Sequence, residues 1–215
     1  MAVRTIRILG EPGDDVLRKV ASPVDVLDGS VQTLIDDMLE TMRDAPGIGL
    51  AAPQVGVGLR IVVIEVPEVP AFALINGEVV RHSGQRWVRE GCLSIPGYRG
   101  ELFRSVKVTV KGLDRQGRQI RIKAADDLLA QALEHEIDHT NGLLYVDLLS
   151  GPEHLHRHSD DENDETAEVE PGEESNEACE RVADAPPTHH VRRGIRPRLV
   201  MPHAKLRATS GGALG

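Results

Sequence analysis

His135-Glu136-Ile137-Asp138-His139 is the stretch that decides how this chain folds and what it can do. It places two histidines four positions apart in a segment whose apolar residues recur at helical spacing. Residues i and i+4 lie on one face of an α-helix, so both imidazoles can reach one metal ion. Glu136 projects to the flank, where it can accept a proton from a water at that ion. The stretch therefore predicts a metal-dependent hydrolase that still needs a third protein ligand.

A simpler interpretation of these residues is a charged helix face with chance spacing, because H-E-x-x-H alone is only moderately specific. Leu128, Ala132 and His135 continue one stripe of the helix, so His135 taken alone is typical of a core histidine. That interpretation does not account for a second histidine one turn later with a glutamate between the two. We therefore favour the metal site.

Cys92, in Glu90-Gly91-Cys92-Leu93-Ser94, is the leading candidate for the third ligand, although aspartates and glutamates are also available. A free cysteine is most often a small buried hydrophobe, and in isolation Cys92 would be interpreted that way. Beside two histidines, a thiolate ligand is favoured. The chain's other cysteine, Cys179, lies in an acidic segment, and no disulfide is expected.

A third segment, Gly47-Ile48-Gly49-Leu50-Ala51-Ala52-Pro53-Gln54, is rich in glycine and alanine. No Gly-Lys-Ser/Thr follows, so it is not a phosphate-binding loop. An ordinary turn after a helix is the plain alternative. Gln54, however, supplies a neutral amide donor of the kind that a developing tetrahedral oxyanion requires.

The pattern of apolar residues predicts an α+β fold, with mostly antiparallel strands packed around a central C-terminal helix that carries H-E-x-x-H. A first helix is expected to begin with Ser30 as its N-cap and to end near residues 45–47. The second is expected near residues 125–140, opened by Asp126 or Asp127 and ended by Asn141-Gly142. Strands are expected at Ile61–Val66, Ala71–Ile75, Arg86–Arg89, Val106–Lys111 and Ile120–Lys123, the last two forming a hairpin.

Charge divides the chain more sharply than its net value of −9 suggests. Residues 151–188 are strongly acidic and residues 189–215 carry only basic charges, whereas all five aromatic residues precede residue 150. We expect one catalytic domain at 1–150 and a disordered, low-complexity tail at 151–215. His154, His156 and His158 are interpreted as part of that solvated tail. With no apolar run long enough to span a membrane, we expect a cytoplasmic protein.

Taken together and in this order, the three motif segments resemble the three signature motifs of the peptide deformylases, and the resemblance covers about residues 5–150. It implies a metallohydrolase that removes the formyl group from the N-terminal formyl-methionine of new polypeptides and releases formate. The residues that match the family's metal ligands are Cys92, His135 and His139. Glu136 matches the catalytic acid/base, and Gln54 and the backbone N–H of Leu93 match the oxyanion donors.

The resemblance further implies that Ile48 and Gly49 line the substrate cleft and that Arg99 contacts the substrate backbone. It implies Fe2+ as the ion, with Zn2+ or another divalent ion as a substitute, nascent formyl-methionyl polypeptides as substrates, and the ribosome as a candidate partner. The tail after residue 150 does not match the family, so its partner is undefined. Glu134 stands where the family usually has Gln, and Thr140 where it usually has Leu.

Two other functions are compatible with part of this pattern. Another H-E-x-x-H metallohydrolase, such as a peptidase, would resemble a site with a third histidine or a glutamate, so Cys92 argues against it. A deformylase-like binding protein with impaired catalysis would recruit partners through its tail. The presence of every catalytic position argues against that second alternative.

Overall fold

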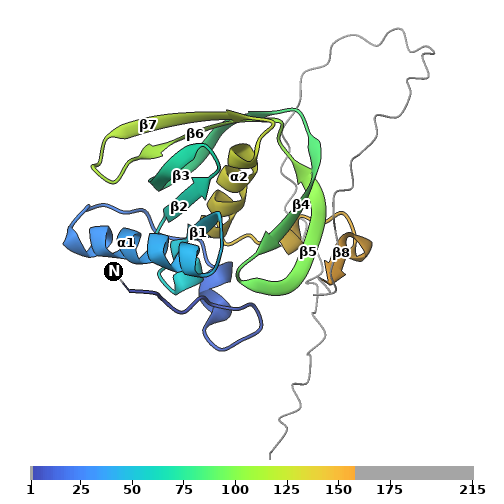
Figure 1. Ribbon diagram of the computed structural model, residues 1–215, viewed down its shortest axis with the longest axis horizontal. Coiled ribbons are helices and arrows are strands. Elements are labelled where there is room, and N and C mark those ends of the chain that lie inside the picture. The colour runs from blue at the N-terminus through green and yellow to red at the C-terminus, as the bar shows by residue number, and fades with distance from the viewer. Residues whose placement is uncertain (1, 158–215) are drawn as a thin grey trace, which may run out of the picture. The chain divides into compact units, whose positions relative to one another are not determined.

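The computed structural model describes residues 2–157 (Figure 1). Five strands form an antiparallel sheet in the order β1-β2-β3-β6-β7, and three more form a second antiparallel sheet in the order β4-β5-β8. The strands of the first sheet are β1 (Gly49–Ala51), β2 (Ile61–Val66), β3 (Val69–Ser83), β6 (Lys107–Leu113) and β7 (Gln119–Ala125). Those of the second are β4 (Arg86–Cys92), β5 (Ile95–Arg104) and β8 (Leu155–Arg157).

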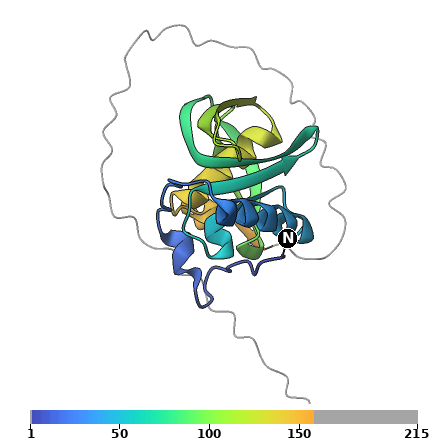
Figure 2. The ribbon, with the colours of Figure 1, turned by 90° about the vertical axis from the view of Figure 1, so that its left-hand side faces the viewer.

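Two helices cover opposite faces of the five-stranded sheet. Helix α1 (Gly29–Asp44) packs Ile35, Met38 and Met42 into a cluster with alternate residues of β2, namely Ile61 and Val63. Helix α2 (Leu128–Thr140) packs Leu133 and Ile137 against the other alternate set, Val62 and Ile64. Because successive strand residues face opposite sides, burial on both faces makes β2 apolar almost throughout. Figure 2 shows α1 lying along the outer side of this sheet.

Helix α2 occupies the centre of the fold, between the five-stranded sheet and the hairpin of β4 and β5 (Figure 1). Its N-cap is Asp127, whose carboxylate accepts the backbone N–H of Ala130 at 2.7 Å. It ends at Asn141, and Gly142 follows with φ of +73°. The predicted α+β class, the antiparallel strands and the central H-E-x-x-H helix are therefore confirmed.

The predicted start of the first helix needs correction. The N-cap is Asp28 rather than Ser30, because the Asp28 carboxylate accepts the backbone N–H groups of Ser30 at 2.9 Å and Val31 at 3.1 Å. Asp28 precedes the helix, so its carboxylate can accept two of the first free N–H groups, one of which is Ser30's own. The end of the helix at Asp44, just before Pro46-Gly47, is as expected.

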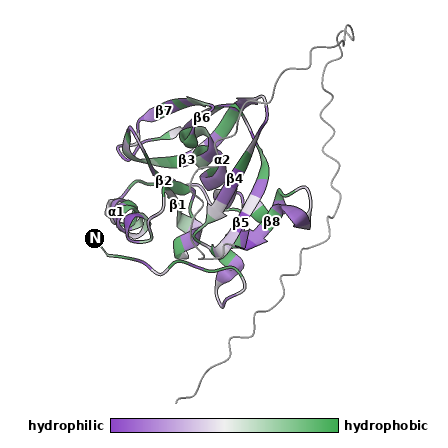
Figure 3. Cartoon of the chain, turned by 45° about the vertical axis from the view of Figure 1, so that its right-hand side comes forward, coloured by the Kyte–Doolittle hydropathy of each residue, from purple (hydrophilic) through white to green (hydrophobic). Residues whose placement is uncertain are grey.

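All five predicted strand segments overlap strands of the structure, and β6 and β7 pair as the expected hairpin. Strands β1, β5 and β8 were not predicted. Figure 3 shows hydrophilic and hydrophobic residues interspersed along β7, which follows from its one solvent-facing side. Within residues 2–157, no helix is long and apolar enough to cross a membrane.

Ordered structure continues past the expected domain boundary at residue 150. Residues Pro152–His154 form a short 3-10 helix, and β8 then pairs antiparallel with β5, Arg99 lying opposite His156. This places His154 and His156 on the folded domain rather than in a solvated tail. The remainder of the expected disordered tail, including His158 and Cys179, lies outside the described residues.

Candidate metal centre

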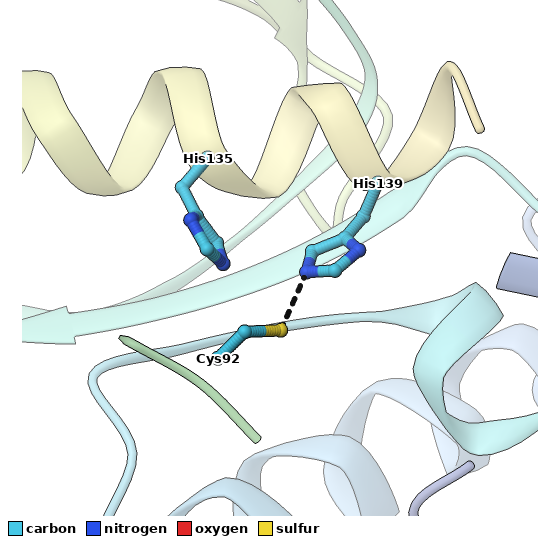
Figure 4. A group of neighbouring side chains, drawn as sticks. All are labelled: Cys92, His135 and His139. Atoms are coloured by element: carbon cyan, nitrogen blue, oxygen red, sulfur yellow. Dashed lines mark hydrogen bonds between the residues drawn. The ribbon is translucent and has the colours of Figure 1, made fainter. Parts of the chain in front are cut away.

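Three side chains from two separate elements converge at the centre of the molecule (Figure 4). Cys92 ends β4, while His135 and His139 lie one turn apart on α2 and turn their imidazoles toward it. The Cys92 Sγ lies 3.3 Å from His139 Nε2. One ligand atom from each of the three residues lies within 4.8 Å of the others. The structure thus brings together the three ligands that the sequence predicted.

The donors fit a divalent metal ion by their chemistry. Two imidazole nitrogens and a thiolate form a set that binds zinc or iron well and leaves a fourth position open. The Glu136 Oε2 is buried without a hydrogen-bond partner among the described residues, which is typical of a site built around a further group. Within the part of the chain that is described, no other group of three such donors occurs.

His135 is held in orientation from behind by a carboxylate. Its Nδ1 lies 2.8 Å from the Glu90 Oε2, so a proton on Nδ1 directs Nε2 toward Cys92. Burial alone would raise the pKa of Glu90, but hydrogen bonds from His135 and Arg104 outweigh it and lower that pKa to about 2. Glu90 therefore remains an anion that holds one imidazole tautomer in place.

Arg104 completes this arrangement with a buried ion pair. Its Nε and Nη2 donate to the two Glu90 oxygens at 2.7 and 2.9 Å, and its Nη1 donates to Asp138 at 2.5 Å. A two-pronged guanidinium–carboxylate contact fixes the plane of the carboxylate as well as its position. Asp138 thus serves as an ion-pair partner that anchors Arg104.

Glu136 lies beside the ligands and is 4 % exposed. Burial raises the pKa of its carboxyl group to about 7. A carboxyl group whose pKa lies near neutrality, in a cavity beside metal ligands, is suited to accepting and donating protons. Glu134, two residues earlier, faces elsewhere, because its two oxygens accept from the Ser105 backbone N–H at 2.9 Å and hydroxyl at 2.7 Å.

Gly49 is the one position that lets Glu136 lie where it does. A Cβ added at Gly49 would lie 2.4 Å from the Glu136 Oε1 and 2.9 Å from its Cγ, well inside contact distance. The strand β1 can therefore approach this carboxylate only with glycine at residue 49.

Replacing Gly49 by Ala is accordingly expected to displace Glu136 and to lower kcat by roughly a hundredfold, the size of effect that small misplacements of catalytic groups produce. Metal content should stay at the wild-type level, because Gly49 contacts no ligand. Gly29→Ala is a matched control, since an added Cβ there meets nothing within 4 Å. Equal kcat values for the two variants would contradict this account.

Gln54 approaches the centre from the short 3-10 helix Ala52–Val55. Its Oε1 accepts the Ala51 N–H at 2.8 Å, which fixes the amide and turns Nε2 toward Ser94 Oγ at 3.2 Å and Cys92 Sγ at 3.5 Å. An amide held at one end presents its N–H groups without further loss of side-chain freedom. Ser94 was not singled out from the sequence, although it lies two residues from Cys92.

A cavity of about 470 Å³ opens in front of these side chains. It is bordered by the β1 region, by β4 and the start of β5, and by α2. The predicted site residues that line it are Ile48, Gly49, Gln54, Cys92, Leu93, Arg99, His135 and Glu136. His139 lies deeper and does not line it. The volume of the cavity is suited to a few residues of peptide or to a small molecule of similar size.

The sequence did not reveal the pairing of Glu90 with Arg104, which depends on strand register. Glu90 begins one of the motif segments, but Arg104 lies fourteen residues later and reaches Glu90 only because β4 and β5 are paired and its side chain spans four register positions. Of the two unusual positions on α2, Thr140 is 2 % exposed and donates its hydroxyl to the Ile137 carbonyl at 2.8 Å, so it is packed and satisfied.

Comparison with known proteins gives one consistent result. The family model for polypeptide deformylases matches residues 4–154. A peptide deformylase of Dehalococcoides mccartyi (strain CBDB1) is 57% identical over 157 residues, covering 73% of this chain and 92% of that protein. The crystal structure of a peptide deformylase from Legionella pneumophila superposes with a TM-score of 0.65 at 49% identity, covering 69% of this chain and 87% of that one.

Similarity also reaches beyond the folded domain. A peptide deformylase of Thermomicrobium roseum is 47% identical over 182 residues and is covered to 99%, in an alignment that spans 80% of this chain. That share is larger than residues 2–157 could supply, so the alignment extends into the tail. The expectation that nothing after residue 150 matches the family is therefore wrong for this relative.

Proposed function

Since this chain belongs to the polypeptide deformylase family, and so is a metal-dependent hydrolase that removes the formyl group from N-terminal formylmethionine, we propose that Cys92, His135, His139 and Glu136 form its catalytic centre. One observation carries the proposal. The buried Glu136 carboxylate, with an oxygen lacking a partner in the described chain, lines the cavity together with His135 and Cys92, two of the three clustered ligands. The experiment that tests these roles is the replacement of Glu136, which is argued in full below.

In this proposal Cys92, His135 and His139 hold the ion through Sγ and ring nitrogens. A divalent ion supplies Lewis acidity, lowering the pKa of a water toward about 7. Glu136 would take a proton from that water as the water oxygen adds to the formyl carbon. The Gln54 amide and the Leu93 backbone N–H donate to the oxygen that becomes negative. Glu136 then delivers the proton to the nitrogen as the C–N bond breaks, leaving formate and a free amine.

We further propose that Ile48 and Gly49 on one side of the cavity and Arg99 on the other position the substrate backbone. Ile48 is 40 % exposed and Arg99 lies on the solvent side of β5, so both are accessible to a peptide. A bound peptide restrained on two sides would keep its formyl carbon beside Glu136, which is how binding lowers the barrier to reaction.

The ion is proposed to be Fe2+, with zinc or another divalent ion able to replace it. Zinc binds such a nitrogen and sulfur set more tightly than iron by the general affinity order, so iron must be supplied without competition. The proposal rests on the family resemblance and on a thiolate ligand, which makes an iron site prone to oxidation.

Protein loaded anaerobically with Fe2+ is expected to release formate from a formyl-Met tripeptide faster than zinc-loaded protein. The iron form should lose activity in air while the zinc form keeps it. Formate release and free amine should rise together with all peptide bonds intact, as mass spectrometry can check. Cleavage of an internal peptide bond would favour the peptidase alternative, and equal, air-stable rates with both ions would refute the assignment of iron.

The cytoplasm as the place of action and the ribosome as a partner are proposed from the nature of the substrate, a newly made polypeptide. We also propose that the catalytic domain, first expected at residues 1–150, includes β8, because that strand pairs with β5 beside Arg99.

A further inference from the structure

Two aromatic side chains lie exposed on the second sheet, away from the core. Trp87 of β4 and Phe103 of β5 are directly opposite in the strand register, with ring centroids 4.5 Å apart at 67°. They are 44 % and 54 % exposed. His154 also makes an edge contact with Trp87, with ring centroids 5.0 Å apart at 77°. Trp87 thus contacts two rings while presenting apolar surface to solvent, an arrangement that marks a binding surface more often than a core.

This aromatic pair is continuous with the substrate cavity. Register pairs Trp87 with Phe103, Arg89 with Glu101, and Gly91 with Arg99. Alternate residues share a face, so these three pairs form one strip on the solvent side of β4 and β5. Arg89, Gly91 and Arg99 also line the cavity. A chain that leaves the cavity over them therefore meets the two aromatic rings next.

A substrate could also leave the cavity as an added strand along the edge of β4, but the start of α2 obstructs that path. The Gln131 side-chain amide donates to the Arg89 carbonyl at 3.1 Å. Arg86 Nη2 donates to the Asp127 carbonyl at 2.5 Å. The first bond occupies the Arg89 carbonyl and the second ties β4 to the start of the helix, so an extended peptide could continue there as an added strand only by displacing the Gln131 amide. It is directed onto the solvent face instead.

We propose that Trp87 and Phe103 bind the downstream part of the polypeptide substrate. This rests on the deformylase activity and extends it from the formylated end to residues that the cavity does not hold. From Cys92 to Trp87 a strand spans about 17 Å, at about 3.3 Å per residue, which an extended substrate covers with about five residues. Apolar side chains near the sixth and seventh substrate residues are those that the aromatic surface accommodates.

The charges of the strip favour a polypeptide over a nucleic acid. Arg89 pairs with Glu101 at 3.3 Å, and His156 lies 3.6 Å from the same carboxylate. With Arg99 included, the strip holds two arginines and one glutamate, and this small net charge falls short of the basic track that a phosphate backbone requires. Aromatic surface flanked by so little net charge suits chains of varied sequence.

The test compares substrate lengths in the metal-loaded enzyme. We use a formyl-Met tripeptide, a formyl-Met decapeptide with Leu and Phe at positions six and seven, and the same decapeptide with Ser at both. Phe103→Ala and Trp87→Ala are expected to raise KM about fivefold for the apolar decapeptide, to leave kcat unchanged, and to leave the tripeptide and the Ser decapeptide unaffected. Val80→Ala, an exposed residue of the other sheet, is the control and should alter none of them.

Binding can be followed separately, because Trp87 is the only tryptophan of the chain. In a Glu136→Gln background, the apolar decapeptide should shift the emission of Trp87, whereas the tripeptide should not. Equal losses on tripeptide and decapeptide would overturn the proposal and indicate a structural role, as would unchanged KM on the decapeptide. A loss seen only with ribosome-bound chains would overturn it in favour of docking to the ribosome. Tripeptide turnover reports the deformylase activity itself throughout.

Discussion

Glu136→Gln is expected to lower kcat/KM for a formyl-Met tripeptide by roughly 10²- to 10⁴-fold, the usual contribution of a general acid–base group. An amide of the same size keeps the contact with Gly49 and the packing of α2, but it can neither accept the proton of the water nor deliver it to the leaving amine. Metal content, measured by elemental analysis, should equal that of the wild type. Formate release is the readout.

Glu134→Gln provides a matched control on the same helix. Glu134 bonds to Ser105, away from the cavity, and glutamine can still accept from the Ser105 N–H. Its kcat/KM is expected within about twofold of the wild-type value, as for a substitution that leaves catalytic contacts unchanged. A Glu136→Gln enzyme as fast as Glu134→Gln would show that the proton is moved by another group.

Cys92→Ser should release the ion. A serine hydroxyl is a far weaker ligand than a thiolate, and removal of a single hydrogen-bond partner of a ligand already costs about 10- to 100-fold in metal affinity. Loss of a ligand should exceed that range, and activity should fall with occupancy. Metal retained after dialysis against a mild chelator is the measurement.

The second cysteine, Cys179, provides a control for the Cys92→Ser substitution. Cys179→Ser changes the only other thiol of the chain, so it should keep both ion and activity. If Cys92→Ser also kept a full complement of metal, the third ligand would have to be a carboxylate. Of the acidic groups near the site, Glu90 already holds His135 and Arg104, which leaves Glu136 with its unpaired oxygen as the carboxylate that could replace the thiolate.

Periodic segments of the sequence were sufficient to locate both helices and most of the five-stranded sheet. Strand β5 was not predicted because Pro96, Gly97 and Gly100 interrupt the alternation of its apolar residues. Gly100 is nevertheless required there, because an added Cβ would lie 2.5 Å from the Tyr145 ring. Strand β8 escaped because only three residues pair, and their pairing depends on a partner more than fifty residues earlier in the chain. Local pattern carries no information about such distant partners.

The same limit applies to the residues of the functional site. Residues within contiguous motifs, such as His135, Cys92 and Gln54, could be assigned roles from sequence. Arg104 could not, because its partners are distant in the chain: the register places it opposite Arg86, four positions from Glu90, and its long side chain reaches back to Glu90 and across to Asp138 on the helix. The aromatic strip likewise emerges only when β4 and β5 are laid side by side.

The three ligand atoms belong to elements that otherwise belong to different parts of the fold: Cys92 ends a strand of the small sheet, and both histidines lie on the helix that packs on the large one. Occupancy of the site and closure of the seam between β4 and α2 are therefore thermodynamically linked. Removal of the ion is therefore expected to weaken the contact between β4 and α2. An interaction that stabilises this contact is expected to raise the affinity of the site for the ion. By the same reciprocity, a polypeptide that binds β4 more tightly when the seam is closed would raise the affinity of the site for its ion.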